Sequence, residues 1–245
     1  MPNKPLQALH ARHPRRWRHF DYVYPVISRR AGGLSIGINL NVDKVCNWDC
    51  VYCQVDRKIA PLRNDVDLQQ LESELQWTVP WASSGECWHE PPFDTVPDVQ
   101  RRLNDIAFSG DGEPTTFPKF LEACRIAVAT RAQWAQPETK IVVLSNMAMA
   151  HRSAVQKAFA LLDQHQGEIW AKLETGTAEF YEAIDRSAVP FNIILDNILA
   201  TGKIRPIVIQ SLFMRLRNQP PTAGQFDAFL DRLTELIEAG CRIKL

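Results

Sequence analysis

The chain alternates short apolar runs rich in β-branched residues with longer segments whose apolar positions repeat at helical spacing. Residues 67–79, for example, place Leu68, Leu71, Leu75 and Val79 on one helical face. The apolar runs predict six strands, at residues 34–40, 106–110, 140–146, 168–174, 205–213 and 241–245. The periodic segments predict helices at residues 67–79, 118–135, 152–165 and 223–240, with two shorter ones around Phe180 and Ile194. Strands that alternate with helices indicate an α/β fold with a parallel sheet.

This pattern fits either a doubly wound sheet or a complete or partial barrel. In both architectures ligands bind at the carboxyl ends of the strands. Polar residues of the sequence fall at these ends. Three cysteines follow the first predicted strand and "SGDGEPT" (109–115) follows the second, while the later strands end near Asn146, Lys172, Glu174, Gln210 and Ser211.

Two regions lack the alternating pattern. Residues 80–98 hold four prolines and no period, which predicts a long loop that could act as a lid. Residues 1–20 contain no carboxylate but several arginines, and Arg29 and Arg30 follow. We therefore divide the chain into a basic arm, residues 1–33, and a core domain, residues 34–245. The arm could contact phosphates or could simply be solvated.

Composition adds few constraints. Over 245 residues, 28 basic side chains balance 28 acidic ones, so no net charge favours nucleic acid or membrane. No apolar run reaches the 18 or more residues that a membrane span needs, and the N-terminus lacks the apolar core of a signal peptide. We expect a cytoplasmic protein without a membrane partner.

Three of the six cysteines, Cys46, Cys50 and Cys53, lie in "CNWDCVYC". In a reducing compartment, clustered cysteines more often bind metal or do redox chemistry than form disulfides. Zinc usually takes four protein ligands, and His89 is the candidate for the fourth. A [4Fe–4S] cluster held by three cysteines would leave one iron open to a substrate or cofactor. The scattered Cys87, Cys124 and Cys241 are expected to be inert apolar residues.

The C-x3-C-x2-C spacing, with Tyr52 just before the last cysteine, resembles the radical S-adenosylmethionine (SAM) enzymes. "SGDGEPT" resembles the glycine-rich element that ends the second strand in that family, and "VLSN" (143–146) and "IVIQSLF" (207–213) match later elements less specifically. The resemblance covers residues 34–245 and is greatest to the iron–sulfur oxidoreductase branch that includes the wyosine-forming tRNA enzymes. It implies a partial (β/α)6 barrel of the TIM type.

The resemblance also implies roles for residues. Cys46, Cys50 and Cys53 would ligate three irons, and the amino and carboxylate groups of SAM would bind the fourth. Electron transfer from the reduced cluster, supplied by a donor such as flavodoxin or ferredoxin, would cleave SAM to a 5′-deoxyadenosyl radical that abstracts hydrogen from a substrate. The residues expected to contact SAM are Tyr52, Gly110, Asp111, Gly112, Glu113, Asn146 and Gln210. Lys172 and Glu174 could contact SAM or the substrate.

Two departures from the family pattern limit these expectations. No second cysteine triad precedes Cys46, and the chain stops inside the predicted sixth strand, so the core domain could be truncated. The substrate is unidentified, with tRNA as a candidate. The alternative function is a non-enzymatic zinc or iron–sulfur module that binds RNA. We further expect a side chain at Gly112 to block SAM while leaving the cysteines undisturbed.

Overall fold

A computed structural model describes residues 17–244. Its sheet contains six strands in sequential order: β1 (Val23–Ser28), β2 (Gly33–Ile38), β3 (Leu103–Phe108), β4 (Lys140–Ser145), β5 (Gly167–Lys172) and β6 (Val208–Gln210). β1 pairs antiparallel with β2, and all later pairs are parallel. The strand order never reverses, so the crossovers all follow one direction and the sheet has no switch point of the doubly wound kind. The predicted α/β fold is confirmed.

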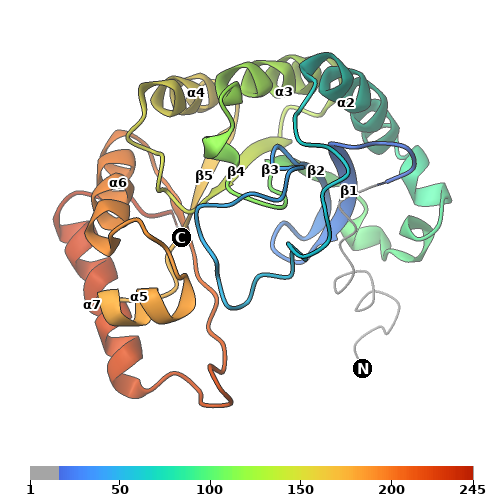
Figure 1. The fold of residues 1–245 in the computed structure, drawn as a ribbon. Helices are drawn as coiled ribbons and strands as arrows, with labels where there is room; N and C mark the ends of the chain where they lie inside the picture. Colours follow the sequence, from blue (N-terminus) through green and yellow to red (C-terminus); the bar gives the residue numbers. More distant parts are fainter. Residues whose placement is uncertain (1–16, 245) are drawn as a thin grey trace.

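The helices form an arc on the outer side of the curved sheet (Figure 1). They are α2 (Leu68–Ser83), α3 (Phe120–Trp134), α4 (Ser153–Asp163), α5 (Ala178–Ile184), α6 (Phe191–Ile204) and α7 (Ala223–Glu238). Short 3-10 turns occupy Glu86–His89, Phe93–Thr95, Asp98–Gln100 and Pro114–Thr116. Between the layers, side chains such as Ile36, Ile106, Val143 and Phe159 are fully buried. No helix between residues 17 and 244 is both long and apolar enough to cross a bilayer.

The structure differs from the sequence-based expectation in three places. The sequence pattern did not predict β1. The predicted strand at 241–245 is wrong, because residues 241–244 make only an isolated bridge between Ile207 and Ile243. The loop predicted to begin at residue 80 is also wrong, since α2 continues through Pro80 to Ser83 and short 3-10 turns follow. The division into an arm and a core stays a prediction: β1 lies within the range of the arm, and residues 1–16 lie outside the described residues.

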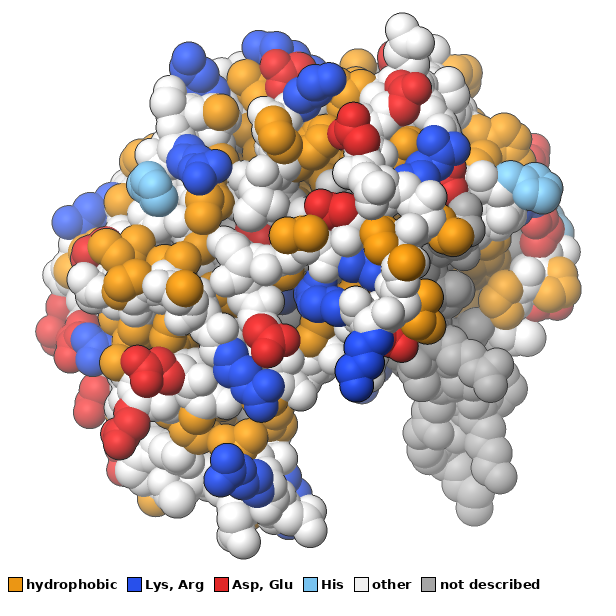
Figure 2. Space-filling view, in the orientation of Figure 1, with side chains coloured by type: hydrophobic (Ala, Val, Ile, Leu, Met, Phe, Trp, Pro, Cys, Tyr) orange, Lys and Arg blue, Asp and Glu red, His pale blue; other side chains and the backbone are white. Residues whose placement is uncertain are grey.

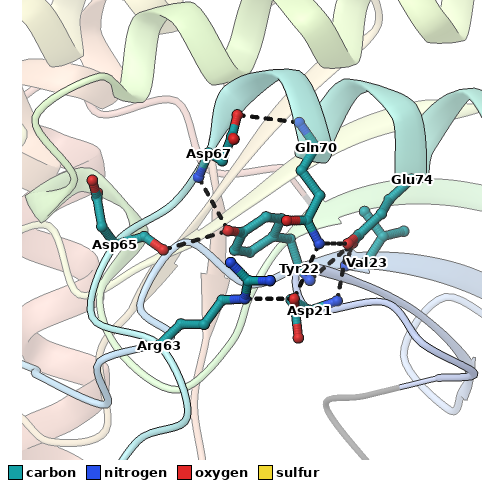
Figure 3. A network of polar contacts seen from close by, with 8 residues as sticks. All are labelled: Asp21, Tyr22, Val23, Arg63, Asp65, Asp67, Gln70 and Glu74. Atoms are coloured by element: carbon teal, nitrogen blue, oxygen red, sulfur yellow. Dashed lines mark hydrogen bonds and ion pairs between the residues drawn. The ribbon is translucent and has the colours of Figure 1, made fainter.

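A buried carboxylate joins the start of β1 to α2 (Figure 3). Glu74 is 3% exposed, and its two carboxylate oxygens accept hydrogen bonds from the backbone N–H groups of Asp21, Tyr22 and Val23 at 3.0, 2.9 and 3.0 Å. The side chain of Gln70 adds a fourth donor at 2.8 Å. One side chain of α2 therefore satisfies three backbone donors that no strand partner could reach.

The same network fixes the segment that leads into α2 (Figure 3). The Tyr22 hydroxyl donates to the backbone carbonyl of Asp65 and accepts from the backbone N–H of Asp67, at 3.4 and 3.1 Å. Arg63 pairs with Asp21 at 2.6 Å. Asp67 also caps α2 by accepting from two backbone N–H groups of the first turn. The long connection between β2 and α2, residues 39–67, is thus held at its far end.

Candidate active site

A cavity of about 640 Å³ lies inside the curved sheet and reaches the carboxyl ends of the parallel strands. It is lined by all residues that the sequence placed at the strand ends or predicted to contact the cluster or SAM: Cys46, Cys50, Tyr52, Cys53, Gly110, Asp111, Gly112, Glu113, Asn146, Lys172, Glu174, Gln210 and Ser211. His89, the candidate for a fourth zinc ligand, does not line it. No residue of 80–98 lines this cavity. The structure therefore brings together side chains from five segments that are far apart in the sequence, and their individual roles stay predictions.

The three clustered cysteines lie on the connection of residues 39–67, which we call the cysteine loop. It contains no helix or strand. Cys46 and Cys50 are half-buried, Cys53 is exposed, and none forms a disulfide. Burial raises the pKa of the Cys46 thiol, and burial together with the charge of Asp185 raises the pKa of Cys50 to about 12. These two thiols hold their protons at neutral pH, so a metal that binds them must displace protons.

Asparagine side chains fasten the cysteine loop to the segment that follows β3. Asn39 donates to the Asp111 carboxylate at 2.8 Å and accepts from the Asp111 backbone N–H at 3.1 Å. Asn41 donates to the Thr116 hydroxyl at 3.2 Å. Within the loop, the Lys44 ammonium donates to the carbonyls of Asp56 and Ile59, both at 3.0 Å. Protein contacts therefore hold the cysteine loop at several points along its length.

Glu113 is buried and connects the ends of β3 and β4. Its carboxylate accepts from the backbone N–H and hydroxyl of Thr115, from the Ser145 hydroxyl at 2.8 Å and from the Asn146 backbone N–H at 2.7 Å. Asn146 in turn donates its side-chain amide to Asn47 in the cysteine loop at 2.7 Å. Three of these donors reach one oxygen of Glu113 and one donor reaches the other, so the side chain ties the ends of β3 and β4 together, while its contact with SAM stays a prediction.

A second buried acidic group lies where β5 ends. The Tyr52 hydroxyl donates to Glu174 at 2.7 Å, and burial raises the pKa of Glu174. Burial and the charge of Glu174 raise the pKa of nearby Asp185 to about 8. The second oxygen of Glu174 and the side-chain oxygen of Gln210 have no hydrogen-bond partner among the described residues. Since both residues line the cavity, these two acceptors are available to the donor groups of a ligand.

Asp105 lies at the opposite end of the cavity and accepts a hydrogen bond from Ser35. Burial raises its pKa to about 6. An unfolded aspartate titrates near 3.9, so the folded chain binds more protons between about pH 4 and 6, and stability falls as pH rises through that window. We expect Asp105→Asn to remove this fall, a relative gain of about 3 kcal/mol at neutral pH. Urea unfolding at pH 4.5 and 7.5 measures it, and an unchanged pH dependence would contradict it.

Gly112 is required for space rather than for backbone conformation. A Cβ at this position would lie 2.2 Å from the carbonyl oxygen of Val45 and 2.8 Å from the side chain of Asn41, and its φ is not in the left-handed region. The space beside Gly112 is filled by the cysteine loop. This clash argues against the expectation that a side chain here leaves the cysteines undisturbed, and the expected loss of SAM binding stays a prediction.

We predict instead that Gly112→Ala displaces the cysteine loop next to Cys46. The variant should lose about 2 kcal/mol of stability through overpacking and should bind less iron than the unchanged chain. Gly224→Ala is the matched control, because a Cβ there meets nothing within 4 Å. Thermal unfolding and iron analysis of both variants test this. Equal iron content in Gly112→Ala and Gly224→Ala would argue against it.

The donor set suits a metal cluster. Three soft thiols without disulfides line one cavity, and unpartnered oxygens of Glu174 and Gln210 line the same cavity. Within residues 17–244, no three His, Cys, Asp or Glu side chains converge as ligands of a single metal ion. The cysteines of a [4Fe–4S] cluster each bind a different iron, so this cluster does not require its ligands to meet at one point. The residues present fit such a group.

No family model matches the sequence. The chain is 24% identical over 187 residues to a UPF0026 protein of Helicobacter pylori strain J99, a match that covers 74% of this chain and 51% of the relative. A UPF0026 protein of Methanocaldococcus jannaschii is 34% identical over 96 residues, 37% of this chain and 24% of that protein. The chain thus spans about half the length of the Helicobacter pylori relative, and these proteins are distant homologues.

Solved structures give the fold comparison. Streptococcus suis SuiB bound to S-adenosylmethionine matches with a TM-score of 0.54 and 12% identity, over 85% of this chain and 40% of that one. TYW1 with a lysine–pyruvate adduct matches with a TM-score of 0.53 and 15% identity, over 98% of this chain and 78% of that one. This chain therefore shares its α/β fold, with a six-stranded and mostly parallel sheet, with SuiB and TYW1. The expected partial barrel is thereby confirmed. The cavity lies at the carboxyl ends of its strands, which is where folds of this kind bind their ligands.

Proposed function

We propose that this chain is a radical SAM enzyme that holds a [4Fe–4S] cluster on Cys46, Cys50 and Cys53. The observation that supports it most directly is the shared cavity: the three thiols and the Gly-Asp-Gly-Glu segment, 110–113, line one space at the strand ends of a radical SAM fold. With only three cysteines in this loop, the cluster would keep one iron for SAM. When bound, cluster and SAM supply one-electron cleavage of SAM to a 5′-deoxyadenosyl radical.

The protein's own residues position these groups. Asn39 and Asn41 hold the cysteine loop against Asp111 and Thr116, and Glu113 fixes the same segment against the end of β4. Tyr52 is held by Glu174 at 2.7 Å, which fixes the ring next to the third cysteine. The free oxygen of Glu174 can accept a hydrogen bond from a cationic or amino group of the bound ligand.

For the substrate, the resemblance to the wyosine-forming branch supports tRNA, as does the basic composition of residues 1–20. The face of the molecule drawn in Figure 2 carries acidic and basic side chains interspersed, without an extended basic region. Any electrostatic contact to RNA from this face would therefore be local. Flavodoxin or ferredoxin is the proposed electron donor, and cytoplasmic location stays a prediction.

Anaerobic reconstitution tests this function. We expect the purified chain to bind iron and sulfide in equal amounts, about four of each per chain, and to form 5′-deoxyadenosine from SAM under dithionite reduction. Deuterated SAM with total tRNA as substrate would show whether label exchanges with RNA. Zinc without sulfide would instead support the metal-binding module, and a full cluster that never cleaves SAM would overturn the enzymatic function.

A further inference from the structure

Arg57 lies just after the last clustered cysteine and contacts three parts of the site. Its guanidinium donates to the backbone carbonyl of Lys44, to the backbone carbonyl of Asp111 at 3.1 Å, and to the sulfur of Cys53 at 3.6 Å. The residue is exposed at the surface yet lines the cavity. The sequence pattern gave no sign of this role, because an arginine in a loop is usually a solvated charge.

We propose that Arg57 raises the reduction potential of the cluster by donating a hydrogen bond to the Cys53 sulfur. This inference rests on the proposed function. On reduction, one electron passes from an external donor to the cluster, and the added negative charge is shared by the cysteine sulfurs. A hydrogen bond and a fixed positive charge at one sulfur stabilise the reduced state more than the oxidised state. Arg57 keeps its proton throughout.

The contact between Arg57 and the Cys53 sulfur is held in place by the surrounding backbone. Both carbonyl acceptors belong to backbone that is fixed elsewhere, by the Lys44 side chain on one side and by Asn39 on the other. The planar guanidinium is thus held at two points while a further N–H reaches the sulfur, a fork that an ammonium group cannot reproduce. The charge of Arg57 also acts to lower the pKa of the Cys46 thiol, opposed by Glu113 and by burial.

Other charges near the thiols differ from Arg57 in lacking a hydrogen bond to sulfur. Lys172 also lines the cavity and its charge acts to lower the pKa of Cys46 and of Cys50, but among the described residues no hydrogen bond joins its side chain to a cysteine. Lys58 follows Arg57 directly in the chain and is exposed, and its described contact is a backbone bond to Asp56 at 2.9 Å. Lys58 therefore provides a matched control, with the same charge one residue away and no bond to sulfur.

A potentiometric titration followed by the EPR signal of the reduced cluster tests the inference. In Arg57→Met, at a fixed potential, we expect about a tenfold lower ratio of reduced to oxidised cluster, which corresponds to about 59 mV for one electron. Arg57→Lys should shift in the same direction but less, because it keeps the charge and loses the fork. Lys58→Met should titrate like the unchanged chain.

The outcomes separate this inference from the proposed function. If the unsubstituted chain does not assemble a cluster, the proposed function is wrong. A full cluster whose midpoint is the same in Arg57→Met overturns the inference alone, as does an equal shift in Lys58→Met, which would indicate a general charge effect. If Arg57→Met binds less iron because the loop loosens, Arg57→Gln and Arg57→Lys give the same comparison. Unchanged midpoints in both would overturn the inference.

Discussion

Cys50→Ala should purify with almost no iron after anaerobic reconstitution, where the unchanged chain should hold about four irons. Cys50 is half-buried in the cysteine loop and lies between the other two thiols in sequence. Its removal would leave two ligands for a cluster whose ligand set is already one short of the usual four. Because cleavage of SAM depends on the cluster, 5′-deoxyadenosine formation should fall to the background without enzyme.

Cys124→Ala is the control for this loss. Cys124 is fully buried in α3 and lines no part of the cavity. Its substitution removes a small apolar group and should cost about 1 kcal/mol of stability while the iron content stays full. Iron and sulfide analysis with the visible absorption of both variants decides the outcome. A complete cluster in Cys50→Ala would refute the ligand assignment.

Glu74→Ala should be the most destabilising of the substitutions considered, by about 4 kcal/mol. It leaves the backbone N–H groups of Asp21, Tyr22 and Val23 without their acceptor (Figure 3). Each donor left unsatisfied in a buried place costs about 1–3 kcal/mol. Urea unfolding followed by circular dichroism measures the change in the free energy of unfolding.

Glu72→Ala serves as the matched comparison, since Glu72 is an exposed residue of the same helix. Its substitution should change stability by no more than about 0.5 kcal/mol. Loss of Glu74 should also detach the start of β1 from the end of the cysteine loop, so iron content should fall together with stability. A Glu74→Ala variant as stable as Glu72→Ala would show that the three backbone donors find other partners.

The sequence predicted the parallel strands and their polar ends well, because strands such as β2 and β4 are buried over most of their length and read as apolar runs. Ile36, Ile106 and Val143 are all fully buried examples. The rule that ligands bind at the carboxyl ends then grouped residues as distant as Cys46 and Gln210. The cavity they line follows from strand order, which no local pattern contains.

β1 and the end of α2 could not be predicted from local pattern. β1 contains Pro25, which argues against a strand except at a sheet edge, where the structure places it. Pro80 likewise argues against a helix, yet α2 continues past it. The compensation is tertiary: Trp81 packs against Trp17, with ring centroids 4.5 Å apart, and is almost fully buried. Contacts between distant segments outweigh the local preference.

The supporting residues of the site were missed for a related reason. Asn39, Arg57 and Asp185 are common polar residues without a distinctive spacing, and their roles depend on the partner that the fold places beside them. The repeated asparagines of "INLN" just before the cysteines were the available signal, since side-chain amides often fasten irregular backbone. The sequence therefore predicted the candidate ligands, and the structure showed which side chains hold the loop that carries them.

The pinned ends of the cysteine loop have a consequence for entropy. A free connection as long as residues 39–67 would lose much conformational freedom when it closed around a metal cluster. Here Tyr22 and Arg63 fix one end, Asn39 fixes the other, and Lys44 ties the middle. In the proposed cluster protein, these contacts would place most of that ordering cost on folding. The binding energy of the thiolates would then be left for cluster affinity rather than for ordering the loop.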